Sequence, residues 1–406
     1  MKCGLLGGKL GHSYSPQIHS HLGSYSYELY ENQPEELEDF LKNGDFTGLN
    51  VTIPYKKAVI PFCSELSPRA SALGAVNTIV RRADGSLIGH NTDFFGFETM
   101  LRNSGLQVGG KKALVLGTGG ASNTAIAVLQ EQGANVIVIS RSGENHYGNL
   151  HQHKDAAVIV NATPVGMYPN VGASPVDLEN FPALEGVLDV IYNPARTQLL
   201  LDAEERGIIA VNGLEMLVAQ AKESAEWFTG HEISDSTIPM IHSILKNQME
   251  NIILIGMPGS GKSTVGAILA EKTGKTLVDA DTYLVEKAGR SIPDIFATDG
   301  EAVFRSLETE VLAELGKRSG LIIATGGGCV TQERNYPLLH QNGTIFCLYR
   351  DLDQLPTDGR PLSQATKLTE MYRIRKPMYE RFADHLVDNN AKPGAAAETI
   401  LNILEG

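Results

Sequence analysis

Short runs of apolar residues alternate along the chain with longer stretches of mixed polarity. Residues 112–116 and 251–255, for example, are mostly aliphatic, as strands are when helices cover both faces of a parallel sheet. The stretches between such runs have the length of helices. This alternation predicts an α/β fold with mostly parallel sheets. Because two of the runs lead straight into glycine-rich turns, we expect at least two nucleotide-binding folds.

Length and composition indicate how many domains the chain can form and which class of protein it belongs to. The 406 residues suffice for two or three domains, and 42% hydrophobic with 20% charged residues is ordinary for a soluble globular protein. A formal charge of −13 argues against nucleic acid or a membrane surface as a partner, since both are anionic. No apolar run could cross a membrane, the N-terminus lacks a signal peptide, and the four cysteines lie far apart. We expect a cytoplasmic protein that acts on small molecules.

The second glycine-rich turn has the form of a phosphate-binding loop, Gly256-Met-Pro-Gly-Ser-Gly-Lys262-Ser263-Thr264. Small residues let successive backbone N–H groups wrap a phosphate, a lysine reaches the β and γ phosphates, and a hydroxyl binds Mg²⁺. The following helix would direct its positive end at the same anion. The candidate ATP-binding residues are Gly256, Gly259, Ser260, Gly261, Lys262, Ser263 and Thr264. Such loops serve GTPases, motors and small-molecule kinases alike, so the loop alone leaves the substrate open.

Carboxylates and arginines further along the chain narrow the choice of acceptor. Asp279 and Asp281 follow a strand-like run, and alternation along an extended chain would place both on one side. One of them could help to hold Mg²⁺ while the other accepts a proton from a substrate hydroxyl. Further motifs follow in order at residues 295–308, 324–329, 358–362 and 375–379. Together with the loop, these motifs make residues 251–406 resemble shikimate kinase.

This resemblance implies roles for individual residues. Arg305 and Arg375 would hold the carboxylate of shikimate, because a planar guanidinium matches a carboxylate. Asp281 would hold the ring hydroxyls. Asp281 would also orient or deprotonate the attacking hydroxyl. The backbone of Gly326, Gly327 and Gly328 would approach the acceptor closely. Next to Ser263, Asp279 would lie just outside the direct ligands of Mg²⁺.

The resemblance also implies a lid over the nucleotide. Arg360 would lie on this lid, bind ATP and offset the charge of the phosphoryl group in transfer. One stretch departs from the family pattern: residues 351–358 are short and acidic, where the family commonly has a helix with a basic residue against adenine.

The first glycine-rich turn, Gly117-Thr-Gly119-Gly120-Ala121-Ser122, lacks the third glycine of a dinucleotide-binding turn. By itself it fits a plain strand–helix turn equally well. The next strand-like run ends in Ser140-Arg141-Ser142, where an NAD-binding unit usually has an acidic residue. A cation and hydroxyls at this place suit the 2′-phosphate of NADP.

Four segments before this turn combine hydroxyls, amides, one lysine and one aspartate, namely residues 11–19, 50–56, 74–78 and 89–93. Such groups could bind a small polyhydroxylated acid and move one proton, although each alone is typical of a surface turn. With residues 161–167, 189–194 and 212–220 they form about seven motifs in order. Over residues 1 to about 248, the ensemble resembles shikimate dehydrogenase.

The second resemblance implies reduction of 3-dehydroshikimate by NADPH. Lys56 and Asp93 would form the catalytic pair: Lys56 donates a proton or stabilises charge on the ketone oxygen, and Asp93 keeps it charged. The substrate-binding residues would be Ser13, Ser15, Thr52, Asn77, Asn91, Tyr192 and Gln220. The NADP-binding residues would be Gly117, Gly119, Gly120, Ala121, Ser140, Arg141, Ser142, Val190, Gly213 and Met216. Asn145 stands where the family often has a second basic residue, so NADP preference would rest on Arg141.

The expected domains are a substrate-binding lobe (residues 1–83 plus 213–248), a Rossmann NADP-binding lobe (84–212) and a three-layer α/β/α P-loop kinase (249–406). The two reactions are consecutive, since shikimate is the product of one and the acceptor of the other. Two alternatives stay open. One is a ligand-sensing regulator without catalysis, which Lys56 and Lys262 disfavour. The other is a quinate or shikimate dehydrogenase fused to another small-molecule kinase, which Arg305 and Arg375 disfavour.

Overall fold

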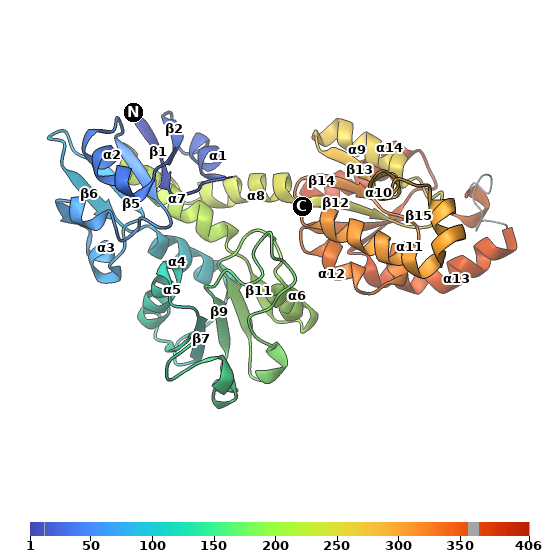
Figure 1. Cartoon of the computed structure of the whole chain (residues 1–406), viewed down its shortest axis with the longest axis horizontal. Helices are drawn as coiled ribbons and strands as arrows, with labels where there is room; N and C mark the ends of the chain where they lie inside the picture. The colour runs from blue at the N-terminus through green and yellow to red at the C-terminus, as the bar shows by residue number, and fades with distance from the viewer. Residues whose placement is uncertain (12, 356–364, 406) are drawn as a thin grey trace. The chain divides into compact units, whose positions relative to one another are not determined.

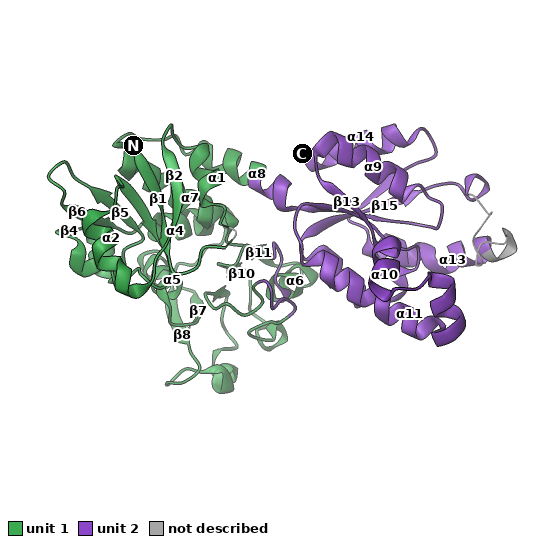
Figure 2. Cartoon of the chain, turned by 45° about the horizontal axis from the view of Figure 1, so that its top comes forward, with its two compact units in different colours: residues 1–167, 173–192, 199–244 green, residues 168–172, 193–198, 245–406 purple. Residues whose placement is uncertain are grey.

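In the computed structural model, residues 1–11, 13–355 and 365–405 are described, so the predicted lid residue Arg360 lies outside the described residues. The chain divides into two compact units, coloured separately in Figure 2. The first comprises residues 1–167, 173–192 and 199–244, and the second comprises residues 168–172, 193–198 and 245–406. Helix α8 (Thr237–Met249) carries the chain from the first unit into the second.

The first unit begins with a six-stranded mixed sheet in the order β2-β1-β3-β5-β6-β4. Strands β1 and β3 are parallel, whereas β5 runs antiparallel to β3 and β6. Leu6, Leu49 and Ile79 from three neighbouring strands are buried together in its core. The strands are β1 (Lys2–Gly7), β2 (Ser26–Glu31), β3 (Gly48–Val51), β4 (Glu65–Leu66), β5 (Thr78–Arg81) and β6 (Leu87–His90). The helices are α1 (Ser15–Ser20), η1 (Pro34–Glu36), α2 (Leu37–Asn43), η2 (Ile60–Phe62) and α3 (Pro68–Leu73).

The second sheet of this unit is five-stranded and parallel throughout, in the order β11-β10-β9-β7-β8. Along β7, Ala113 and Val115 face one apolar cluster while Leu114 and Leu116 face another, the alternation expected of a strand covered on both faces. The strands are β7 (Lys112–Leu116), β8 (Asn135–Ile139), β9 (Val158–Asn161), β10 (Gly186–Asp189) and β11 (Ile209–Val211). The helices are α4 (Asp93–Ser104), α5 (Gly120–Glu131), η3 (Tyr147–His153), η4 (Leu178–Asn180), α6 (Gln198–Glu205) and α7 (Leu214–Thr229).

The hairpin of β5 and β6 affects the expected lobe boundary at residue 84. Arg81 pairs with Leu87 across this hairpin, and both strands belong to the first sheet. A boundary at residue 84 would therefore divide two strands that pair with each other. We place the change of lobe after β6 instead, where α4 begins and packs against α5 and α7.

The second unit contains a parallel five-stranded sheet in the order β13-β14-β12-β15-β16, with helices on both faces (Figure 1). This arrangement confirms the predicted three-layer α/β/α fold. The strands are β12 (Asn251–Ile255), β13 (Thr276–Asp279), β14 (Leu321–Ala324), β15 (Gly343–Tyr349) and β16 (His385–Asp388). The helices are α9 (Lys262–Thr273), α10 (Ala280–Ala288), α11 (Ile292–Gly316), η5 (Cys329–Thr331), α12 (Asn335–His340), η6 (Leu352–Gln354), α13 (Ala365–Phe382) and α14 (Pro393–Glu405).

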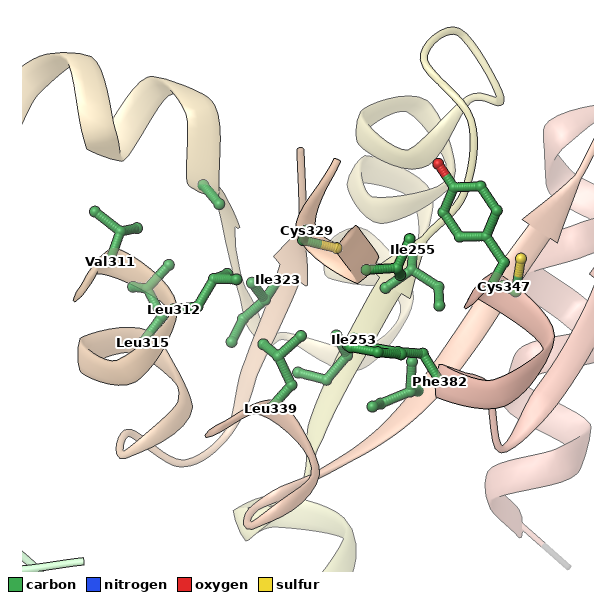
Figure 3. Close-up of a cluster of buried hydrophobic side chains, with 14 of the residues drawn as sticks. Ile253, Ile255, Val311, Leu312, Leu315, Ile323, Cys329, Leu339, Cys347 and Phe382 are labelled. Atoms are coloured by element: carbon green, nitrogen blue, oxygen red, sulfur yellow. The ribbon is translucent and has the colours of Figure 1, made fainter. Parts of the chain in front are cut away.

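Alternation along β12 builds the two cores of this unit. Ile253 and Ile255 point to the face covered by α11, α12 and α13, where Figure 3 shows Ile253 between Leu339 and Phe382. The intervening residues Ile252 and Leu254 belong to the opposite core, formed with α9 and α14. Burial of both faces keeps the strands rigid and presents the loops at their carboxyl ends. Of the described helices, none combines the length and apolarity needed to cross a membrane.

Candidate active sites

The first site contains an ion pair between Lys56, in the turn after β3, and Asp93, the first residue of α4. Lys56 Nζ lies 2.6 Å from Asp93 Oδ2, and the side chains are 25% and 11% exposed. Partial burial strengthens such a pair relative to a surface ion pair. The ammonium is thus held in place by a carboxylate yet remains accessible, which suits a proton donor beside a carbonyl oxygen. The structure therefore brings the predicted catalytic pair together.

Predicted substrate-binding amides lie close to this pair. Asn77 Nδ2 donates to Thr92 Oγ1 at 3.0 Å and to Gln220 Oε1 at 3.5 Å. Asn91 Nδ2 donates to the Ala75 carbonyl at 2.9 Å. The buried Oδ1 of Asn91 accepts no hydrogen bond from the described residues, and such a group is costly to bury unpaired. A substrate hydroxyl would supply the missing donor.

The predicted residues Ser13, Ser15 and Tyr192 also gather around one turn. The Ser15 N–H donates to Ser13 Oγ at 3.2 Å, and Tyr14 between them meets Tyr192 edge to face, with ring centroids 6.2 Å apart. Thr52 is partly exposed, and its N–H donates to the Leu6 carbonyl at 2.9 Å. The serine turn thus lies next to Tyr192, and its hydroxyl groups suit a carboxylate.

Ser224 on α7 is a residue that our sequence analysis missed. Its Oγ lies 2.8 Å from Asn50 Nδ2, 2.8 Å from Thr78 Oγ1 and 2.9 Å from Thr92 Oγ1, and it donates to the Gln220 carbonyl at 2.8 Å. This fully buried hydroxyl joins the strands of the first sheet to the helix that carries Gln220. Its spacing of four residues from Gln220 on one helix face was the available signal.

The turn after β7 has room for a dinucleotide phosphate. Gly117 has φ of 109°, and a Cβ placed on Gly119 or Gly120 would meet no atom within 4 Å, so the backbone is open to a ligand there. Helix α5 begins at Gly120 and directs its N-terminus at this space. In place of the missing third glycine, the buried Ser122 donates from Oγ to the Gly117 carbonyl at 2.6 Å. The donor set fits the pyrophosphate of NADP.

Two further parts of the cofactor region lie at the ends of neighbouring strands. Arg141 is exposed just beyond β8, which pairs in parallel with β7, so its cation and the glycine turn share one edge of the sheet. Ser140 Oγ donates to the Ser142 carbonyl and closes that turn. Met216, near the start of α7, packs in the same apolar cluster as Val190.

In the second unit, the loop after β12 is curled around the Lys262 side chain. Gly256, Gly259 and Gly261 have φ of 142°, 86° and 92°, values that suit glycine. Lys262 Nζ donates to the carbonyls of Gly256 at 2.9 Å and Met257 at 3.1 Å. Helix α9 begins at Lys262 and points its N-terminus into the loop. These donors fit a phosphate chain.

Asp279 connects the loop to the next strand. Its Oδ2 accepts a hydrogen bond from Ser263 Oγ at 2.8 Å, which is the pair expected next to Mg²⁺. Its Oδ1 accepts from the N–H groups of Asp281 at 3.1 Å and Thr282 at 3.2 Å. This cap starts α10 directly after Asp279. Our expectation that Asp281 continues an extended strand is therefore wrong, because Asp281 lies in the first turn of the helix.

The glycine run after β14 brings the predicted acceptor residues together. A Cβ on Gly326 would lie 2.7 Å from Asp281 Oδ1, and one on Gly328 would lie 2.2 Å from Arg305 Nη1. Arg375 Nη1 donates to the Gly327 carbonyl at 2.9 Å. Only glycine permits such an approach by two side chains. Two guanidinium groups and the carboxylates of Asp281 and Glu308 therefore surround a bare stretch of backbone.

Glu308 is a second residue that the sequence analysis did not assign. Its Oε2 accepts from Arg305 Nη1 at 2.8 Å, and its side chain is only 3% exposed. Burial raises the pKa of Glu308, and the adjacent Arg305 guanidinium opposes that shift. Its buried Oε1 has no hydrogen-bond partner among the described residues. The spacing of three residues from Arg305 on one helix was the signal for this contact.

The two folds and their sites define a pyridine-nucleotide oxidoreductase followed by a P-loop small-molecule kinase. Comparison with known proteins names both parts. The family model for the shikimate dehydrogenase substrate binding domain matches residues 5–79, and that for shikimate kinase matches residues 258–405. The chain belongs to the shikimate dehydrogenase family and carries a shikimate kinase domain after it. It is thus an NADP-dependent oxidoreductase and an ATP- and Mg²⁺-dependent kinase of the shikimate pathway, as its two resemblances predicted.

Individual relatives support the first assignment. Shikimate dehydrogenase (NADP(+)) of Clostridium perfringens is 34% identical over 265 residues, which cover 60% of this chain and 97% of the relative. The crystal structure of shikimate dehydrogenase 1 from Peptoclostridium difficile is 38% identical, covers 60% of this chain and 97% of that one, and has a TM-score of 0.56. The Thermus thermophilus enzyme in complex with NADP(H) and shikimate is 31% identical, covers 60% and 98%, and has a TM-score of 0.54.

Proposed function

We propose that the chain catalyses two consecutive steps. The first unit reduces 3-dehydroshikimate to shikimate with NADPH, and the second phosphorylates the 3-hydroxyl of shikimate with MgATP. The observation that carries the proposal is the 2.6 Å pair of Lys56 and Asp93, near Asn91, whose buried Oδ1 accepts no hydrogen bond from the described residues. The kinase domain would use shikimate, which is the product of this reduction. Reduction, rather than oxidation of shikimate, is therefore the direction that supplies the second step.

In the first step, NADPH supplies a hydride to the ketone carbon. Negative charge then builds on the ketone oxygen, and the Lys56 ammonium stabilises it or donates a proton to it. Asp93 holds that ammonium in place. Asn77, Asn91 and Gln220 bond the ring hydroxyls, and the serine turn at Ser13 and Ser15 takes the carboxylate. Arg141 binds the 2′-phosphate of the cofactor.

In the second step, MgATP supplies the phosphoryl group. Lys262 leaves the carbonyls of Gly256 and Met257, where it lies at 2.9 and 3.1 Å, and turns to the phosphates. Ser263, whose Oγ donates to Asp279 Oδ2, would bind Mg²⁺ directly, and Asp279 would lie just outside the direct ligands. Asp281 orients the acceptor hydroxyl and takes its proton, while Arg305 and Arg375 hold the carboxylate. The role of Arg360 rests on the resemblance alone.

A two-stage assay on the purified full chain tests both steps. NADPH absorbance is followed with 3-dehydroshikimate, and ADP release is followed after shikimate and MgATP are added. We expect Lys56→Ala to lower the first rate by at least about 100-fold and to spare the second, and Lys262→Ala to do the reverse. The matched controls are the exposed neighbour Lys57→Ala and Lys272→Ala at the other end of α9.

Each variant retains one activity as an internal check of folding. If Lys56→Ala leaves the first stage intact, or Lys262→Ala the second, the corresponding assignment is wrong. No turnover of either substrate would favour a ligand-sensing protein. Faster NADPH formation from quinate and NADP than from shikimate would favour a quinate dehydrogenase.

A further inference from the structure

The guanidinium of Arg305 is bonded by two carboxylates from its own helix. Glu308 accepts from Nη1 at 2.8 Å, while a single oxygen of Glu301 accepts from both Nε at 3.3 Å and Nη2 at 3.1 Å. Glu301 lies one turn before Arg305, and Glu308 lies almost one turn after it. A cavity of about 530 Å³ opens at this place, lined by Glu301 and Arg305 among others.

Glu301 occupies one complete fork of the Arg305 guanidinium, the pair formed by Nε and Nη2. A guanidinium offers two pairs of parallel N–H groups, Nε with Nη2 and Nη1 with Nη2. Glu301 takes the first pair, and Glu308 takes one of the two N–H groups of Nη1. A substrate carboxylate that binds Arg305 through Nε and Nη2 must therefore replace Glu301.

The exposure of the two glutamate side chains also makes Glu301 easier to release from Arg305 than Glu308. The Glu308 side chain is 3% exposed, and separating it from Arg305 would leave a buried charge without a partner. The Glu301 side chain is 65% exposed and would be hydrated at once. Gly300 breaks α11 with φ of 81°, so Glu301 starts a new helical segment whose positive end tolerates a released carboxylate.

The charge balance of the site favours the same exchange. Arg305 and Arg375 face the acidic groups of Asp281, Glu301 and Glu308 around the glycine run. A substrate carboxylate added to this set would meet more negative than positive charge. Movement of Glu301 into solvent keeps the net charge of the set unchanged, because the incoming anion takes the place of the departing one.

We propose that Glu301 is a built-in competitor of the acceptor's carboxylate, which the acceptor displaces from the outer edge of Arg305. Glu301 thereby sets the KM for the acceptor without taking part in phosphoryl transfer. This inference rests on the proposed role of Arg305 as the carboxylate-binding residue. It also assigns opposite tasks to two glutamates on one helix, since Glu308 holds Arg305 in place while Glu301 weakens acceptor binding.

Steady-state kinase kinetics of the full chain test the proposal with shikimate and its methyl ester, which lacks the charge. Glu301→Gln is expected to lower the KM for shikimate by up to about five-fold, the factor that corresponds to an exposed ion pair of about 1 kcal/mol. The kcat should stay the same, and so should the KM for the ester. Glu310→Gln, an exposed charge change on the same helix, is the matched control and should leave both KM values unchanged.

The outcomes separate this inference from the proposed function beneath it. Equal KM values of the wild type for the acid and the ester would show that Arg305 does not bind a carboxylate, and both ideas would fall. A clear preference for the acid, with an unchanged or raised KM in Glu301→Gln, would overturn the inference alone and make Glu301 a support of Arg305. Glu301→Ala is the second variant and is expected to behave as Glu301→Gln does.

Discussion

Gly213 and Val190 meet backbone to backbone: a Cβ atom on Gly213 would lie 2.1 Å from the carbonyl oxygen of Val190. The Gly213 N–H also donates to the Ile191 carbonyl at 3.0 Å. Because no side chain stands between them, α7 can begin directly beside the end of β10. This close approach joins two segments that we propose to line the nicotinamide end of the cofactor site.

Gly213→Ala tests this approach. A methyl group must push α7 away from Val190, which should destabilise the first unit by about 1–3 kcal/mol and raise the KM for NADPH several-fold. Dehydrogenase kinetics measure the second effect. Thermal melts followed by fluorescence measure the first, since Trp227 in α7 is the only tryptophan of the chain. Gly109→Ala is the control, because its Cβ would have only an ordinary contact at 3.5 Å. Equal effects of the two substitutions would contradict the argument.

Asp93→Asn is expected to lower the dehydrogenase kcat by about 10- to 100-fold. The amide keeps the size of the side chain but loses the charge that holds Lys56 Nζ at 2.6 Å, so the ammonium is less well placed beside the ketone oxygen. Initial rates of NADPH oxidation measure the change. Asp84→Asn is the control, since Asp84 lies in an exposed turn and only bonds Ser86. A wild-type kcat in Asp93→Asn would remove Asp93 from the mechanism.

Much of the fold could be predicted because its signals are local. Each parallel sheet begins with an aliphatic strand, a glycine turn and a helix, and the conformations of Gly117 and Gly261 show why those positions need glycine. The acceptor cluster was predicted by resemblance, residue by residue. Its arrangement around Gly326 to Gly328 depends on the carboxyl edge of a sheet, where loops from distant strands meet.

The missed residues are those whose partners are remote in sequence or whose environment is set by packing. Ser224 bonds Asn50 across 174 positions, and nothing near either residue indicates the contact. Local alternation predicts an extended chain from Asp279 to Asp281, yet the cap by Asp279 starts a helix there. Glu308 looks like any charged residue of a helix until burial and Arg305 give it a role.

Asp279→Asn separates two tasks of one carboxylate. Asparagine is as good a helix cap as aspartate, so α10 should keep its start, whereas the charge beside Ser263 is lost. We expect the kinase to need several-fold more Mg²⁺ for half-maximal rate, with little change in the thermal stability of the second unit. Titration of activity with Mg²⁺ at fixed ATP measures this. Asp294→Asn, at the start of α11, is the control for a charge change near a helix cap. A Mg²⁺ requirement that does not change would place the ion elsewhere.

Lys275 ties the end of α8 to the kinase sheet. Its Nζ donates to the carbonyls of Asn247 at 2.6 Å, Gln248 at 3.0 Å and Glu250 at 2.8 Å. Lys275→Met leaves these acceptors without their cation and should destabilise the second unit by about 1–3 kcal/mol. Kinase activity that remains after brief heating should fall at a lower temperature, while kcat at 25 °C stays unchanged. Lys272→Met, whose ammonium is 3.7 Å from Glu398 on the surface, should have no such effect. Equal heat resistance of the two variants would show that the tie is dispensable.

Glu223 on α7 makes the stability of the first unit depend on pH. Burial, together with the nearby carboxylates of Glu226 and Glu98, raises its pKa from 4.5 to about 8, although Lys222 and Arg69 act in the opposite direction. Below about pH 4.5 the group is protonated in both the folded and the unfolded chain. Between about pH 4.5 and 8 the folded chain keeps the proton and the unfolded chain releases it. Rising pH therefore favours unfolding over this window.

Glu223→Gln should remove this share of the pH dependence. At pH 8 we expect its melting temperature, followed through Trp227, to exceed that of the wild type by a few degrees, since about 1 kcal/mol corresponds to roughly 2–4 °C in a domain of this size. Near pH 4.5 the two should melt together, because glutamine then resembles the protonated acid. Glu232→Gln, an exposed carboxylate in the loop after α7, should follow the wild type throughout. Parallel curves for Glu223→Gln and the wild type would show that Glu223 is ionised in the folded protein.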